Sequence, residues 1–187
     1  MHLTRFSMYK RLQSALPLPL SGDILGISGL KHFRPFFHPH NANVLEVEYP
    51  EVDMQCLPFE AGTFVIVISD QVIEHLADPR QALWEAFRVL RPGGLGIHTT
   101  CFLNPIHYGP EDYYRFSRAG LIALCPDDTD LVESGSWGNR AALGLLLIRD
   151  TLFRFLQVPE ERGPVHWLAT YNEAKYPIVT WVIARKK

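Results

Sequence analysis

The alternation of apolar and polar residues is clearest between residues 57 and 100, where two apolar runs flank an amphipathic segment. The run from Phe64 to Ser69 is typical of a buried strand. From Pro79 to Leu90, apolar residues recur at helical spacing, and the pattern breaks at Pro92-Gly93-Gly94 before a second apolar run, Leu95 to Thr100. The segment therefore predicts a β-α-β unit.

Further elements are expected on both sides of this unit. The patterns predict strands at 23–27, 43–49, near 52–55, 130–134 and 178–184, and helices at 4–15, 118–124 and about 140–155. The connection between Tyr49 and the strand near Val52 is shorter than the dozen or more residues of a helical crossover. The crossover after the second strand is therefore trimmed.

Two segments stand apart from the regular pattern. Residues 102–117 are irregular and rich in aromatics, Pro and Gly, which is typical of a functional loop. The apolar helix that begins near Leu143 carries Arg149 and Asp150 and falls short of the roughly 20 apolar residues of a membrane span. It predicts a core or surface-docked helix, and a membrane-surface or partner-binding helix is the alternative.

Composition narrows the class of protein. A chain of 187 residues with 47% apolar and 20% charged residues predicts one globular domain. Its net charge of -2 gives no field to attract nucleic acid. Three cysteines without metal-ligand spacing favour reduced thiols, and we find no targeting or transmembrane segment, so we expect a cytoplasmic protein. The sequence does not indicate an oligomeric state.

The eight histidines show no zinc-binding spacing. His38 and His40 are the nearest approach to a metal pair, and no third ligand accompanies them. We therefore expect no metal site.

Four short motifs carry a family resemblance: Leu57-Pro58-Phe59, Glu74-His75, Ala77-Asp78-Pro79 and Arg88 to Gly94. Together they resemble class I S-adenosylmethionine (SAM)-dependent methyltransferases of the small-molecule branch, with a type 11-like domain, over roughly residues 22–135. The resemblance implies a three-layer, Rossmann-like α/β sandwich with a mostly parallel seven-stranded sheet and an antiparallel last strand. It implies one domain over 1–187, with a helix or lid at 1–20, a substrate-side loop at 102–117, and SAM as the cofactor.

In an open α/β sheet, ligands bind beyond the carboxyl ends of the strands. The resemblance implies cofactor contacts from the first strand end, from the acidic residue after strand two, and from the residues before Leu57. These are Gly26, Ser28, Gly29, Glu48, Asp53 and Met54. The family usually has an acid in place of Gly26 and a glycine in place of Ser28. Ordinary strand turns, solvated glutamates and an Asp turn cap are the structural alternatives.

The end of the next strand supplies a second implied group. Ser69, Asp70 and Gln71 would lie next to the reacting sulfonium of SAM. His75 would line the cleft or cap the following segment. Asp78, directly before Pro79, reads as a helix N-cap.

The loop at 102–117 supplies the expected acceptor site. His107 is the candidate catalytic base, because imidazole titrates near neutrality. The segment from His107 to Ser117 is similar to one found in a subset of the family that looks as if it acts on sugars or other small polar metabolites. The candidate substrate residues are Tyr108, Tyr113, Tyr114, Arg115 and Trp137. The alternative is structural: Tyr114 fixes the loop, Arg115 pairs with Asp112, and Asn139 caps a helix.

The sequence therefore predicts a SAM-dependent methyltransferase that acts on an oxygen or nitrogen of a small polar molecule, a sugar being one candidate. A methyltransferase-like binding or scaffold protein without catalysis is the alternative, because Gly26, Ser28 and Val65 depart from the family pattern. A nicotinamide-dependent dehydrogenase is disfavoured, because no Gly-x-Gly-x-x-Gly follows the first strand.

Overall fold

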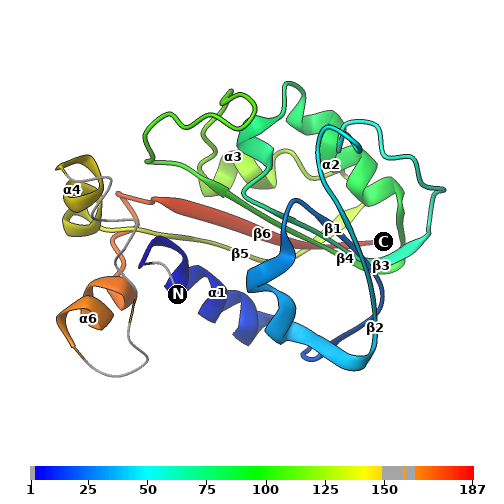
Figure 1. Cartoon of the computed structure of the whole chain (residues 1–187), viewed down its shortest axis with the longest axis horizontal. Coiled ribbons are helices and arrows are strands. Elements are labelled where there is room, and N and C mark those ends of the chain that lie inside the picture. The colour runs from blue at the N-terminus through cyan, green and yellow to red at the C-terminus, as the bar shows by residue number, and fades with distance from the viewer. Residues whose placement is uncertain (1–2, 149–157, 159–162) are drawn as a thin grey trace.

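A six-stranded sheet forms the centre of the molecule in the computed structural model, which describes residues 3–148, 158 and 163–187 (Figure 1). The strands lie in the order β2-β1-β3-β4-β6-β5. Their bounds are β1 Leu20–Ile27, β2 Phe37–Val47, β3 Phe64–Asp70, β4 Leu90–Cys101, β5 Thr129–Trp137 and β6 Val179–Lys186. The first four are parallel, and β6 runs antiparallel to both β4 and β5. The mostly parallel α/β sheet is confirmed.

The sheet has six strands within the described residues, and not the seven that the sequence predicted. The prediction of a strand near 52–55 is wrong, because the backbone groups of this segment form the hydrogen bonds of turns. Val52 N donates to Glu48 O (2.9 Å), and Cys56 N donates to Asp53 O (3.0 Å). The connection from β2 to β3 therefore has neither a helix nor a strand, so the expected trimmed crossover is confirmed.

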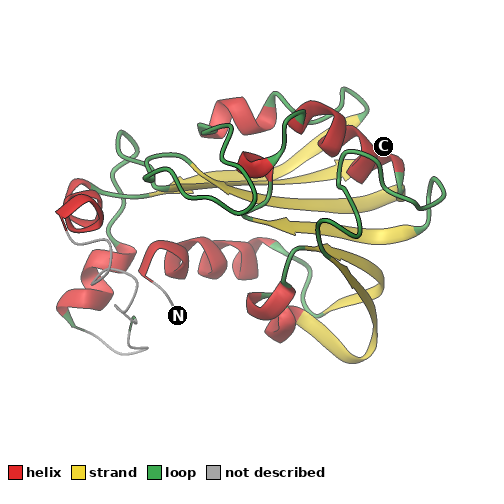
Figure 2. Ribbon diagram, turned by 45° about the horizontal axis from the view of Figure 1, so that its top comes forward, coloured by secondary structure: helices red, strands yellow, loops and turns green. Residues whose placement is uncertain are grey.

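Helices cover both faces of the sheet and make three layers (Figure 2). One face carries α2 (Pro79–Arg88) and α3 (Arg118–Ile122), and the other carries α1 (Leu3–Ala15) and α6 (Pro164–Thr170). The helix expected at 140–155 is α4 (Arg140–Ile148), and its remainder lies outside the described residues. Helix α6 was not expected. Within the described ranges, no helix combines the length and apolarity needed to cross a bilayer.

Helix α2 forms where its capping residues and apolar stripe predict it. Asp78 Oδ1 accepts from Gln81 N (3.0 Å), and Pro79 occupies the first turn, so the expected N-cap is confirmed. The buried stripe includes Ala82, Leu83 and Phe87. It packs in the same core cluster as Met54 and Leu57, which fixes the segment before β3 against the sheet.

The connection from β1 to β2 contains two short 3₁₀ turns, η1 (Leu30–His32) and η2 (Arg34–Phe36), in place of an α-helix. Phe33 is buried and meets Tyr9 of α1 edge-to-face at 5.6 Å between ring centroids. Helix α1 thus packs over the segment that a crossover helix would otherwise fill.

His98 on β4 is fully buried and makes the fold sensitive to acid. Its Nδ1 lies 2.8 Å from Ser69 Oγ, and burial lowers the pKa of the imidazole to about 3. The unfolded chain protonates this group below about pH 6.5 while the folded protein does not, so stability falls as the pH drops from 6.5 towards 3. We expect the free energy of unfolding to fall by about 2 kcal/mol between pH 7 and pH 5 on this account.

Urea unfolding of the wild type and His98→Leu at both pH values tests this expectation. The substitution should remove about 2 kcal/mol of the difference between pH 7 and pH 5. An equal pH dependence in both proteins would contradict it.

Candidate functional site

Two cavities open at the carboxyl ends of the parallel strands, where ligands bind in this class of sheet. The smaller cavity has a volume of ≈ 440 Å³, and Ser28 and Tyr113 are among its lining residues. The larger has a volume of ≈ 630 Å³, and Arg5 and Val179 are among its lining residues. Gln71 lines both. Both volumes lie within the range of small-molecule sites, and Gln71 forms a wall that the two cavities share.

The backbone is strained at the two strand ends that border the cavities. Ser28, after β1, has φ 61°, and Gln71, after β3, has φ 59°. A non-glycine residue in this left-handed region costs about 1 kcal/mol or more. Thr99 holds Gln71 in place: its carbonyl oxygen and Oγ1 each accept from Gln71 N at 3.1 Å.

The smaller cavity brings together six of the residues predicted from sequence. They are Ser28, Asp53, Met54, Gln71, His75 and Tyr113. The Asp53 carboxylate accepts from Gln55 N (2.8 Å) and from the Gln55 side-chain amide (3.1 Å), which also gives it the turn-forming role named as the alternative. Met54 is buried beside it. The wall thus combines a carboxylate, a backbone segment and apolar surface.

Glu48 does not take part. It lies after the last residue of β2, is exposed and is absent from the lining of both cavities. Its neighbour on the same strand face, Glu46, instead accepts from Leu30 N (3.3 Å) and Arg34 Nη2 (2.7 Å). The assignment of a cofactor contact to Glu48 finds no support in this geometry, because β2 ends one residue too early.

The two glycines after β1 differ in what surrounds them. A Cβ at Gly26 would stand 2.2 Å from Leu30 Cδ1, so the space that this glycine leaves is filled by a side chain and not open to a ligand. The expected contact from the Gly26 backbone stays a prediction. At Gly29, with φ 70°, a Cβ would meet nothing within 4 Å, so its contact stays a prediction.

Ser69 and Asp70 hold the structure together beneath the cavities. Ser69 is fully buried against His98. Asp70 Oδ2 accepts from Tyr9 Oη (2.5 Å) and Oδ1 accepts from Thr99 Oγ1 (2.6 Å), which fastens α1 to the sheet. Neither residue lines either of the two cavities, and their direct contact with the cofactor stays a prediction. Burial, and then the Asp70 carboxylate, raise the pKa of Tyr9, so the phenol stays the donor.

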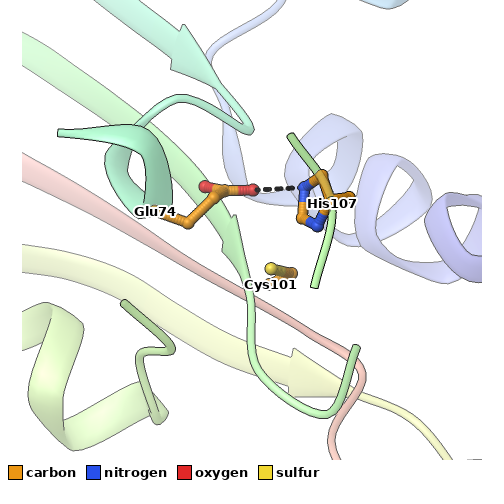
Figure 3. A group of neighbouring side chains, drawn as sticks. All are labelled: Glu74, Cys101 and His107. Atoms are coloured by element: carbon orange, nitrogen blue, oxygen red, sulfur yellow. Dashed lines mark ion pairs between the residues drawn. The ribbon is translucent and has the colours of Figure 1, made fainter. Parts of the chain in front are cut away.

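His107 lines the larger cavity and lies between the carboxylates of Asp112 and Glu74, the second of which is drawn beside it in Figure 3. Its Nε2 lies 3.9 Å from Glu74 Oε1, and its Nδ1 lies 3.3 Å from Asp112 Oδ2. Asp112 also accepts from the His107 backbone N (2.7 Å). The Arg115 guanidinium, bonded to both Asp112 oxygens, lowers the pKa of that carboxyl to about 2. The Asp112 carboxylate therefore fixes both the loop backbone and the imidazole.

Of the other predicted acceptor-binding residues, some line a cavity and others hold the loop in place. Tyr108 lines the larger cavity. Arg115 lines neither cavity: it pairs with Asp112 and donates to Asn104 O (3.2 Å) and Pro105 O (3.1 Å), which is the structural alternative. Tyr114 Oη donates to Ala77 O (3.2 Å), which again fixes the loop.

Trp137 does not lie at the rim. It is 1% exposed in the core cluster that α1 covers, so the predicted substrate contact is corrected. The next loop residue, Asn139, accepts from Ala142 N (2.8 Å) and caps α4, as its alternative stated.

Sequence reasoning missed four residues at the larger cavity. Arg5 and His32 line it from α1 and η1, Cys101 lines it from the end of β4, and Glu74 lies beside His107 (Figure 3). The sequence signalled Glu74 only as half of the Glu74-His75 pair. No local pattern links Glu74 to Cys101, because β4 brings the thiol to this place from a distant part of the chain.

Comparison with known proteins shows a likeness to methyltransferases. Residues 13–97 match the model of a methyltransferase domain. A 2-methyl-6-phytyl-1,4-hydroquinone methyltransferase of Oryza sativa is 34% identical over 91 residues, 49% of this chain and 24% of the relative. A ubiquinone biosynthesis O-methyltransferase of Roseobacter denitrificans is 29% identical over 107 residues, 54% of this chain and 43% of the relative. The chain thus spans less than half the length of these relatives.

The likeness in fold extends beyond residues 13–97, which match the methyltransferase domain. The structure of a SAM-dependent methyltransferase from Mesorhizobium loti aligns over 98% of both chains with a TM-score of 0.63, at 14% identity. This likeness covers the sheet and both helical layers, including the parts of the chain that follow the matched domain.

Proposed function

We propose that the chain is a SAM-dependent methyltransferase, which binds SAM across the two adjacent cavities and methylates a small molecule, because residues 13–97 match a methyltransferase domain and the fold is that of a solved methyltransferase. The nucleoside would occupy the smaller cavity against Asp53 and Met54. The sulfonium would lie at Gln71, and the acceptor would occupy the larger cavity. The observation that carries this proposal is the presence of Gln71 in the walls of both cavities.

Recognition of the nucleoside follows from the chemistry of the smaller cavity. A carboxylate accepts hydrogen bonds from amino or hydroxyl groups, and the buried Met54 offers apolar, polarizable surface to a flat ring. Ser28 and Gly29 leave open space beside the exposed turn after β1. We propose that this open turn takes the polar end of the cofactor.

The larger cavity suits an acceptor with both polar and apolar parts. Arg5, Asn104 and His107 give polar groups, while Leu146 and Ile178 give apolar surface. The curated relatives named above include an O-methyltransferase and a methyltransferase of a hydroquinone. We propose a hydroxyl oxygen as the acceptor atom, and amines and sugars remain in the test panel.

Methyl transfer requires in-line placement of the acceptor and removal of its proton. The acceptor oxygen forms a bond to the methyl carbon, the carbon-sulfur bond breaks, and S-adenosylhomocysteine (SAH) leaves with the electron pair. His107 stays the predicted catalytic residue, because its imidazole faces the cavity with Asp112 behind it.

Calorimetry with SAM and SAH tests the binding half of this proposal. We expect saturable binding of one ligand per chain, with SAH bound because it presents the same nucleoside and amino-acid groups. The absence of saturation by either compound up to about 1 mM would contradict the proposed function. Binding should also survive Asp127→Asn, an exposed carboxylate outside both cavities.

A binding protein without catalysis is the second candidate, favoured by the Leu30 side chain that fills the space beside Gly26. Transfer of a labelled methyl group from SAM to a panel of phenols, sugars and amines separates the two functions. Label in any hydroxyl product supports the enzyme. Tight SAH binding with no labelled product from the whole panel favours the binding protein.

A further inference from the structure

We propose that Glu74, Cys101 and His107 bind one divalent metal ion of the zinc type at the wall of the larger cavity. One ligand atom from each of the three side chains lies within 4.8 Å of the others. They come from three segments: the 3₁₀ turn η3 (Ile73–His75), the end of β4, and the loop after β4 (Figure 3). The rigid sheet and turn thus hold two ligands, and Asp112 holds the loop that carries the third.

The orientation of His107 leaves a lone pair directed at a carboxylate. Its Nδ1 has Pro105 O at 3.2 Å and Asp112 Oδ2 at 3.3 Å, and both are acceptors. The Asn104 side-chain amide also lies 3.2 Å from Nδ1, and rotation of that amide presents its oxygen, so we assign the ring proton to Nδ1. The unprotonated Nε2 then faces Glu74 Oε1 at 3.9 Å. Two acceptors face each other at a distance too long for a hydrogen bond, and a cation between them removes the repulsion.

The spacing fits a shared metal. Oxygen and nitrogen ligands about 2.0–2.1 Å from a tetrahedral zinc ion lie roughly 3.4 Å apart. The observed 3.9 Å closes to that value with a shift of about half an ångström in side chains. Asp112 behind Nδ1 completes the carboxylate-histidine-metal arrangement that orients metal-binding histidines.

Glu74 supplies an independent observation. Its side chain is fully buried, and Oε2 accepts from Thr100 Oγ1 (2.7 Å), but Oε1 has no hydrogen-bond partner among the described residues. A buried carboxylate oxygen without a partner is costly. It points towards His107 and Cys101, where a cation would satisfy it.

Cys101 completes a neutral set. Burial and the nearby Glu74 carboxylate raise the pKa of its thiol, so the thiol is protonated while the site is empty. When the ion binds, the Sγ proton leaves to solvent and the sulfur lone pair forms the bond to the metal. Thiolate and carboxylate then balance the 2+ charge of the ion. A sulfur, nitrogen and oxygen set favours zinc over magnesium or calcium.

The consequence for chemistry rests on the proposed function. Three protein ligands leave a fourth position, as in catalytic zinc sites, and here it opens to the larger cavity. An acceptor hydroxyl bound there would lose its proton more easily, because the ion stabilises the oxyanion. His107 would then contribute through the metal and not as a free base. The substrate class narrows to molecules with a hydroxyl or thiol able to bind zinc.

Cobalt(II) titration of metal-depleted protein tests the site directly. We expect one equivalent to bind, with the near-ultraviolet charge-transfer band of a cobalt-thiolate bond, and zinc to displace it. Cys101→Ser should abolish that band. Glu74→Gln and His107→Gln should each weaken zinc binding at least about 10-fold, because changes that leave the ligands themselves intact already cost that much. Cys56→Ser and Cys125→Ser, at cysteines outside the cluster, should keep the wild-type spectrum.

Two results would overturn the proposal: no thiolate band with the folded wild type, or binding that survives all three cluster variants and disappears in His38→Ala. Circular dichroism confirms folding, and Cys101→Ser decides the question if Glu74→Gln does not fold. SAH calorimetry on the same preparations separates the proposals. SAH binding without metal binding overturns the metal site alone, and metal binding without SAH binding overturns the proposed function alone.

Discussion

Replacing Glu85 by alanine is expected to lower the free energy of unfolding by about 3 kcal/mol, because it breaks a largely buried ion pair. Glu85 on α2 is 7% exposed, and its carboxylate accepts from Arg88 Nε (2.6 Å) and Arg88 Nη2 (2.8 Å). It also accepts from Leu57 N (3.0 Å). Arg88 in turn donates to Phe59 O (2.9 Å). The alanine variant leaves the guanidinium without its carboxylate and Leu57 N without a partner.

Urea unfolding of the wild type, Glu85→Ala, Arg88→Ala and the double variant measures both the loss and the coupling between the two side chains. Glu51→Ala is the control, since Glu51 is exposed in the connection between β2 and β3 and should change stability by less than about 0.5 kcal/mol. A loss below about 1 kcal/mol in Glu85→Ala, or additive effects in the double variant, would contradict the expectation.

Replacing Asp53 by alanine is expected to weaken SAH binding by about 30-fold or more, because it removes the carboxylate of the smaller cavity. A hydrogen bond to a charged group contributes about 1.5–3 kcal/mol, and loss of about 2 kcal/mol corresponds to roughly 30-fold in affinity. Calorimetry with SAH gives the dissociation constant of each variant.

Asp53→Asn separates binding from turn formation. The amide oxygen of asparagine still accepts from Gln55 N, so the turn persists while the charge is lost. We expect an intermediate loss of affinity with little change in thermal stability. Wild-type affinity in both variants would show that Asp53 serves only the turn, and the nucleoside placement would then be wrong.

The parts of the fold that sequence predicted are those with strong local signals. The β3-α2-β4 unit has buried apolar strands and an Asp-Pro helix start, and each signal corresponds to an observed buried face or hydrogen bond. The expected break at Pro92-Gly93-Gly94 is wrong, because these residues lie inside β4, which begins at Leu90, where its pairing with β3 shifts register. The edge strand β2 begins at Phe37, six residues before the predicted start at Asn43, because pairing with β1 and not a continuous apolar pattern forms it. Helix α6 was missed although Gly163-Pro164 is a helix-start signal, since the surrounding pattern is short.

The site residues that sequence predicted are likewise those next to strong local signals. Residues next to a strong strand end, such as Asp53 and Gln71, lie at the cavities. Glu48 was misplaced because two-residue alternation identifies the face of a strand but not the residue at which the strand stops. Trp137 was misplaced because an aromatic at a strand end looks the same in sequence whether it faces solvent or core. Glu74 and Cys101 meet only through tertiary packing, which no local pattern contains.

Gln71 belongs to the walls of two cavities, and Thr99 of β4 holds its backbone in a strained conformation. Any ligand that moves this residue on entering one cavity also changes the free energy of filling the other. By thermodynamic linkage, the factor by which the first ligand alters the affinity of the second equals the factor in the opposite direction. The order in which two ligands fill the cavities, and the cooperativity between them, thus depend on the conformation of the Gln71 backbone.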